Sequence, residues 1–195
     1  ASFIDKNGGK TKFEYVVPNF NQCKGCHVNQ NRMIPIGPKA RLLNHDFEYK
    51  DGKTNQLKKW TSLNMIKDLP DLTTLPHTSD YDDPTDGSMD ERARAWIDIN
   101  CAHCHRLGAP GETSGLFLNI EETDPKRLGV FKPPVAAGRG SGHRLHTIVP
   151  GEPKKSIMIY RMESIDPGIM MPELGRRLVH KEGVELVRKW IKEMK

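Results

Sequence analysis

The sequence lacks long apolar runs, a strong charge bias and a rich supply of core-forming side chains. No stretch of its 195 residues approaches the roughly 18 consecutive apolar residues that cross a bilayer, so we expect no transmembrane segment. Only 36% of the residues are hydrophobic and 7% are aromatic, which predicts a thin side-chain core. Lys and Arg number 30 against 25 acidic residues and are interspersed with them, so the charge pattern does not indicate a nucleic-acid partner.

The beginning of the chain lacks an initiator Met and the apolar segment of a signal peptide. We therefore expect Ala1 to mark a processed or truncated start. The length of 195 residues is typical of one domain or two small ones.

Cysteine is scarce, but all four cysteines fall in one pattern. Residues 23–27 are Cys-Lys-Gly-Cys-His and residues 101–105 are Cys-Ala-His-Cys-His, so both match Cys-x-x-Cys-His. This is the signature of c-type haem attachment, in which two thiols bind the two vinyl groups of one porphyrin and the histidine ligates its iron. We predict two covalently bound haem c groups, held by Cys23, Cys26 and His27 and by Cys101, Cys104 and His105.

Three other uses of paired cysteines are weaker. A disulfide framework does not require a histidine after both pairs, and a thioredoxin-like dithiol needs one pair in a βαβ context. A four-cysteine zinc site needs the two pairs to meet in space, and their first cysteines lie 78 positions apart, from 23 to 101. That spacing is wider than in the usual zinc ribbon.

Local patterns predict a few regular elements. Residues 3–17 alternate around a turn signal at 7–9 and predict a β-hairpin, and Asp51-Gly52 predicts a further turn. Apolar residues at helical spacing predict helices over 55–66 and 180–194. A capping box, Ser88 with Glu91, begins another helix that runs into Cys101, and we expect Trp96 of this helix and Trp190 to pack together.

Residues 88–195 resemble a class I cytochrome c module. The resemblance rests on the motif at 101–105, on Met171-Pro172 and on the aromatic C-terminal helix ending at 187–191. In that family the Met before Pro is the distal iron ligand, which the resemblance carries to Met171, with Met170 and Met162 as alternatives. The 66 positions from His105 to Met171 are more than a simple module of this family has. Residues 149–175 also resemble exported, often multi-domain bacterial proteins that carry cytochrome c modules.

These observations predict a mainly α fold with two cytochrome c-like haem modules, long Gly/Pro-rich loops and a short N-terminal hairpin. The hairpin and first module would occupy residues 1–78, a linker 79–87, and the second module 88–195. The sixth ligand of the first iron is less defined than that of the second. His45 and Met65 are the leading candidates, His77 just before the linker is a weaker one, and an open or water-bound iron is the remaining alternative.

The leading functional interpretation is a dihaem c-type cytochrome that transfers single electrons between a redox-protein donor and acceptor. Two alternatives remain: a peroxidase-like enzyme with one open haem iron, and an electron-delivery module of a larger oxidoreductase chain or complex. The enzyme would need an acid/base residue over the open iron, and the sequence identifies none. The c-type resemblance implies haem attachment beyond the bacterial inner membrane, so we expect a periplasmic or cell-surface location.

Overall fold

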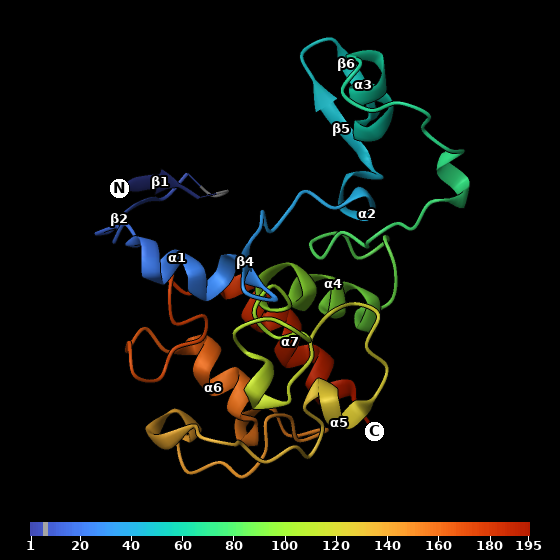
Figure 1. Ribbon diagram of the computed structural model, residues 1–195. Coiled ribbons are helices and arrows are strands. Elements are labelled where there is room, and N and C mark those ends of the chain that lie inside the picture. The colour runs from blue at the N-terminus through green and yellow to red at the C-terminus, as the bar shows by residue number, and fades with distance from the viewer. Residues whose placement is uncertain (6–7) are drawn as a thin grey trace.

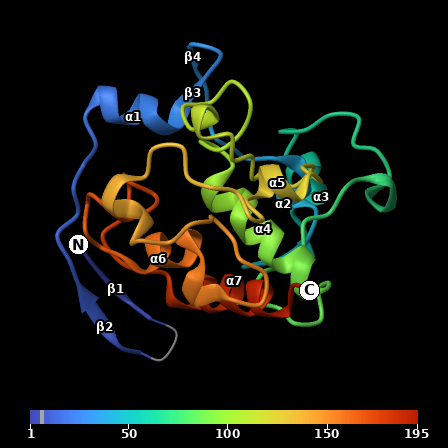
Figure 2. The same ribbon diagram turned by 90° about the horizontal axis from the view of Figure 1, so that it is seen from below.

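The computed structural model describes residues 1–5 and 8–195, in which helices and short strands are joined by long loops (Figures 1 and 2). The helices are α1 (Phe20–His27), α2 (Ala40–Leu43), α3 (Gln56–Ser62), α4 (Met89–Cys101), α5 (Pro125–Leu128), α6 (Ile157–Glu163) and α7 (Lys181–Glu193). The strands are β1 (Ser2–Ile4), β2 (Lys10–Lys12), β3 (Val28–Asn29), β4 (Arg32–Met33), β5 (Asp46–Tyr49) and β6 (Gly52–Asn55).

The prediction of a mainly α fold is wrong. Helices take up 36% of the structure and strands 11%, so the fold is mixed. Among the described residues the strands pair as β1–β2, β3–β4 and β5–β6, three separate antiparallel hairpins. Hairpins this short depend on their turn residues rather than on a long alternating pattern, and for that reason the sequence showed only some of them.

The turns explain where the hairpins form. Gln30 and Asn31 join β3 to β4 and both have positive φ, as the mirror-image turns favoured in hairpins require. Tyr49 pairs with Gly52 at the tip of β5–β6, where the sequence predicted a turn. The N-terminal hairpin is present but ends at Lys12, well before residue 17. Part of its predicted turn, residues 6–7, lies outside the described residues.

The main buried cluster is formed by residues from Ala93 onward. Helices α4 and α7 pack against each other and α6 packs against α7 (Figure 2). Ala93 and Ile97 of α4 are buried in one cluster with Val187 and Ile191 of α7. The capping box of Ser88 and Glu91 is confirmed at the beginning of α4. The helix predicted over 180–194 is observed as α7, with His180 as its N-cap.

A glycine sets the distance between α4 and α7. A Cβ atom at Gly183 would overlap the indole ring of Trp96, so the two backbones approach closely at this point. Trp96 stacks on the ring of His180, with centroids 5.8 Å apart. Trp190 donates from its indole nitrogen to the carboxylate of Asp90 at 2.6 Å. Both tryptophans therefore lie in the buried cluster that the two helices share, and each has a polar partner, whereas their packing against each other stays a prediction.

The first half of the chain has little core of its own. Leu57 is the only buried residue among those described before Ala93. The unit of β5, β6 and α3 projects from the rest of the molecule (Figure 1). The helix predicted over 55–66 is observed here, shortened to α3. The proposed boundaries at 78 and 88 stay predictions, although the core cluster begins at Ala93.

A buried carboxylate joins the two halves. Asp98 of α4 is 2% exposed and accepts a hydrogen bond from the Arg41 guanidinium of α2 at 2.8 Å. Its other oxygen accepts from the backbone N–H of Ile120 at 3.0 Å. Both carboxylate oxygens thus have partners, which is the condition under which a buried charge is tolerated.

We predict that Gly183→Ala destabilises the protein. Replacing Gly by Ala inside a helix ordinarily stabilises it by about 1 kcal/mol. Here overlap with Trp96 would make the substitution destabilising. We expect the free energy of unfolding, measured in urea, to fall by about 1–3 kcal/mol. Lys189→Ala, on the exposed side of the same helix, is the control and should change stability by less than about 0.5 kcal/mol. A stabilised Gly183→Ala variant would contradict the close contact.

Candidate functional site

Helix α4 delivers the second motif. The backbone continues to wind after Cys101, whose carbonyl accepts hydrogen bonds from the N–H groups of Cys104 (3.2 Å) and His105 (2.9 Å). All four cysteines of the chain are free thiols. Burial, reinforced by the charge of Asp98, raises the pKa of Cys101 to about 12, so this thiol is protonated.

The ring of His105 is held in one tautomer. The Ser114 hydroxyl donates its single proton to the Gly111 carbonyl at 2.6 Å, so it accepts from Nδ1–H of His105 at 3.2 Å. Burial, assisted by the charge of Arg161, lowers the pKa of His105 to about 4. The imidazole is therefore neutral and its Nε2 lone pair is available, which is the state that a metal-ligating histidine requires.

The first motif shows the same arrangement on a different element. Helix α1 begins after Pro18 and contains the motif itself, with a capping box between Asn19 and Gln22. The ring nitrogen Nδ1 of His27 lies 3.0 Å from the carbonyl oxygen of Ile34, which is an acceptor only. His27 thus donates from Nδ1 and keeps its Nε2 lone pair, as His105 does.

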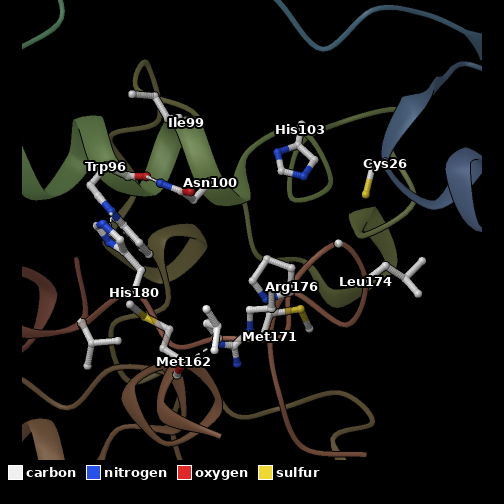
Figure 3. Close-up of a pocket in the computed structure, with 14 residues that line it drawn as sticks. Cys26, Trp96, Ile99, Asn100, His103, Met162, Met171, Leu174, Arg176 and His180 are labelled. Atoms are coloured by element: carbon white, nitrogen blue, oxygen red, sulfur yellow. Dashed lines mark hydrogen bonds between the residues drawn. The ribbon is translucent and has the colours of Figure 1, made fainter. Parts of the chain in front are cut away.

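A cavity of about 320 Å³ lies between the end of α4 and the loop that follows α6 (Figure 3). Most of its wall is apolar and comes from Trp96, Ile99, Met162, Leu174, Leu178 and Val184. Met171 lies on this wall, whereas its neighbour Met170 is buried and does not line the cavity. The cavity therefore favours Met171 and Met162 over Met170 as sulfur donors toward it.

One motif residue points in an unexpected direction. The middle residue of a haem motif is expected to point outward, but His103 lines the cavity and His105 does not. The atom Nδ1 of His103 is buried without a hydrogen-bond partner. The sequence offered no signal for this orientation, because it depends on how the turn after α4 packs.

Two arginines lie beside the cavity with incomplete charge compensation. Arg176 lines it and donates to the carbonyls of Met162 and Ser164, but its Nε has no partner. Arg161 lies 3.7 Å from the Glu173 carboxylate, and its carbonyl accepts from the N–H of Met171. Desolvation lowers the pKa of both guanidinium groups, so the site favours anionic groups at this edge.

The residues around the second motif fit a covalent haem group only in part, because His103 of this motif lines the cavity whereas Cys101, Cys104 and His105 do not. The motif thiols are free, the adjoining cavity is mainly apolar, and a thioether lies on its wall. The unpartnered Nε of Arg176 supplies a donor for a carboxylate such as a haem propionate. Sequence reasoning missed Arg161 and Arg176, because an arginine beside a cavity has no motif of its own.

The candidates for the sixth ligand of the first iron lie on or beside the projecting unit. His45 contacts the carbonyl of Asp46 through Nδ1 (3.0 Å) and the amide of Gln56 through Nε2 (2.8 Å), so both of its ring nitrogens are engaged. Met65 follows α3 and is 63% exposed. In Figure 1, β5 and α3 lie away from α1, so the structure does not bring either candidate to His27.

The two motifs meet in space. Cys104 donates from its thiol to the carbonyl of Gly25 at 3.0 Å, and the N–H of Gln30 donates to the carbonyl of Gly108 at 2.9 Å. Cys26, His103 and Cys104 place their ligand atoms within 4.8 Å of one another. Tertiary packing thus brings one cysteine of each pair together despite the wide spacing, but Cys23 and Cys101 do not belong to this group, so it is not the four-cysteine site considered from the sequence. The proximity of Cys104 and His103 lowers the pKa of Cys26.

Comparisons with protein-family models, with curated proteins and with solved structures find no match to this chain. No helix in the described part of the chain is long and apolar enough to span a bilayer, in agreement with the sequence prediction.

His77 is engaged in a structural contact rather than facing a cavity. Its Nδ1 lies 3.0 Å from the Asn44 carbonyl and its Nε2 lies 3.0 Å from the Asp86 carboxylate. Desolvation lowers the pKa of His77, but these two acceptors outweigh it and the net pKa is raised. The pKa of Asp86 is lowered, mainly by a hydrogen bond from the N–H of Asp80. The pair therefore fixes the predicted linker against Asn44.

We predict that this contact stabilises the protein at acidic pH. The raised pKa of His77 means that its contribution is present below the unfolded value of 6.5 and is lost as pH rises through the folded pKa. His77→Gln should therefore lower stability more at about pH 5.5 than at about pH 8.5. The side chains are 39% and 34% exposed, so the difference should stay below about 1 kcal/mol.

Urea unfolding at the two pH values measures this difference, and His143→Gln at an exposed site is the control. An equal loss of stability at both pH values would show that the positive charge of His77 does not contribute to stability.

Proposed function

We propose that this chain is a dihaem c-type cytochrome that passes single electrons between redox proteins outside the cytoplasm. The observation that carries the proposal is shared by the two motifs. His27 and His105 each donate from Nδ1 to a fixed acceptor and keep the Nε2 lone pair, although they lie on unrelated elements. Two Cys-x-x-Cys-His motifs whose histidines both hold the ligating tautomer favour two haem irons over a disulfide framework.

When bound, each haem supplies an iron that cycles between Fe(III) and Fe(II). The protein contributes orientation, exclusion of water and charge. Ser114 and the Ile34 carbonyl fix the two imidazole rings, and the apolar wall around Met171 limits the entry of water. A thioether donor in such a wall stabilises Fe(II) and favours a high potential. Arg176 offers positive charge to the propionate edge.

The contact between the motifs supports electron relay rather than two independent carriers. Cys26 and Cys104, each the second cysteine of its motif, have sulfurs within 4.8 Å of each other. Groups attached at these positions would lie near one another, so an electron that enters at one motif has a short path to the other. We place the protein in the periplasm or at the cell surface of a bacterium, because haem attachment of this type occurs there.

We predict two haems per chain in protein that is exported through a c-type maturation system. Both should remain attached after denaturation and acid–organic extraction, because four thioether bonds hold them. Replacing Cys23 and Cys26 by Ser should halve the haem content, and so should replacing Cys101 and Cys104. Haem staining of gels and the pyridine haemochrome spectrum measure this content. Freely extractable haem, or none in the exported chain, would contradict the proposal.

We predict that Met171 ligates the second iron. Met171→Leu conserves volume, so the chain should stay folded while the sulfur-to-iron charge-transfer band of the oxidised protein disappears. Met171→His should stay low-spin at a lower potential, since imidazole favours Fe(III) relative to thioether. Met162→Leu on the same wall and Met170→Leu beside it are the matched controls.

Loss of the charge-transfer band in Met162→Leu, with Met171→Leu unchanged, would assign the ligand to Met162 instead. A haem in the unaltered protein that is high-spin and binds carbon monoxide would favour the peroxidase-like alternative.

A further inference from the structure

We propose that the chain, before haem attachment, binds a zinc ion through Cys26, His103 and Cys104. Their ligand atoms already lie within 4.8 Å of one another in the absence of any ion. A tetrahedral site with Zn–S bonds of about 2.3 Å needs two sulfurs about 3.8 Å apart. The three groups therefore need to close by only about 1 Å.

His103 separates this site from the haem motif. A haem attachment motif uses its cysteines and its final histidine, so the histidine between the cysteines has no ligand role there. His103 nevertheless lines the cavity, and its Nδ1 is buried without a partner. Figure 3 shows its ring and the Cys26 sulfur on the same side of the cavity, from elements far apart in the sequence. An unpartnered imidazole nitrogen beside two free thiols is a donor set that a metal ion would complete.

The polypeptide around the three donors is fixed from both sides. His103 and Cys104 lie in the turn that directly follows α4, and Cys26 lies in the last turn of α1. The backbone bond between Gln30 and Gly108 holds these segments together and does not depend on the thiol protons. Metal binding at this site therefore orders little additional chain, which favours affinity.

The donor chemistry selects the ion. Two thiolates and one imidazole suit zinc, whereas magnesium and calcium prefer oxygen ligands. Three protein ligands leave a fourth position for water. Binding requires both sulfurs as thiolates, so zinc displaces any proton still bound to Cys26 or Cys104. The same two sulfurs form thioethers when haem is attached, so zinc and haem exclude each other.

The test uses the full chain produced without haem maturation and kept reduced. Titration with Zn²⁺ alone should saturate at one ion per chain, measured by elemental analysis after desalting. With Co²⁺ as a spectroscopic probe, the site should show thiolate-to-metal charge-transfer bands. Cys26→Ser and His103→Ala should each weaken zinc binding about tenfold or more, because each removes one of three ligands.

Cys23→Ser and Cys101→Ser are the matched controls, since these cysteines belong to the same motifs but not to the cluster. Both should keep the affinity of the unaltered chain. An equal loss in these controls would overturn the proposal in favour of a four-cysteine site. Zinc binding that survives His103→Ala, with an unchanged far-UV circular dichroism spectrum, would also overturn it, and so would the absence of stoichiometric zinc in the unaltered chain.

The His103→Ala variant also distinguishes the zinc proposal from the proposed cytochrome function. In exported, matured protein, His103→Ala should still carry two covalent haems, because the attachment residues are intact. Failure of haem attachment in the unaltered chain would contradict the cytochrome proposal and leave the zinc site standing. Failure of zinc binding in the unmatured chain, with normal haem attachment, would contradict only the zinc site.

Discussion

The crossing of α4 and α7 is the constraint on which the rest of the structure depends. Gly183 lets the Trp96 indole lie directly against the backbone of α7, and His180 stacks on the same ring. This contact holds α4 at one angle, and the end of α4 presents the second motif. Trp96, His180 and Val184 also form the inner wall of the cavity. Core packing and site geometry are therefore fixed by the same few side chains.

The first half of the chain depends on the second for its position. It has a single buried residue, Leu57, among those described, so its own hydrophobic contacts cannot order it strongly. Polar contacts supply the attachment: Arg41 reaches the buried carboxylate of Asp98, and Gln30 bonds to the backbone of Gly108. A covalently attached haem would add the apolar surface that this half lacks. In this interpretation the cofactor is a structural component as well as a redox centre.

Because the two motifs meet, the two proposals assign two chemical uses to the same sulfurs. With haem attached, neighbouring thioethers shorten the path for an electron. Without it, the thiols of Cys26 and Cys104 converge with His103 on a single point. The pKa of Cys26 is lowered and that of Cys104 is raised because the two sulfurs lie close together. Each of these sulfurs can bind either a haem vinyl group or a zinc ion. Under the two proposals, the group that arrives first therefore decides which of the two the site holds.

The sequence by itself determined the local features. The motifs, the Ser88 capping box and the approximate spans of α4 and α7 all follow from short-range patterns. Only the tertiary structure decided that Cys26 and Cys104 meet although they lie 78 positions apart, and that His103 points into the cavity. It also decided that His45 and His77 contact Gln56 and Asp86. The structure also showed that the fold is mixed rather than mainly α. The sequence missed this because the short hairpins depend on turn geometry rather than on an alternating pattern of side chains. The physical reason is general: helical periodicity and capping act within a few residues, whereas the direction of a side chain at a site depends on packing between distant segments.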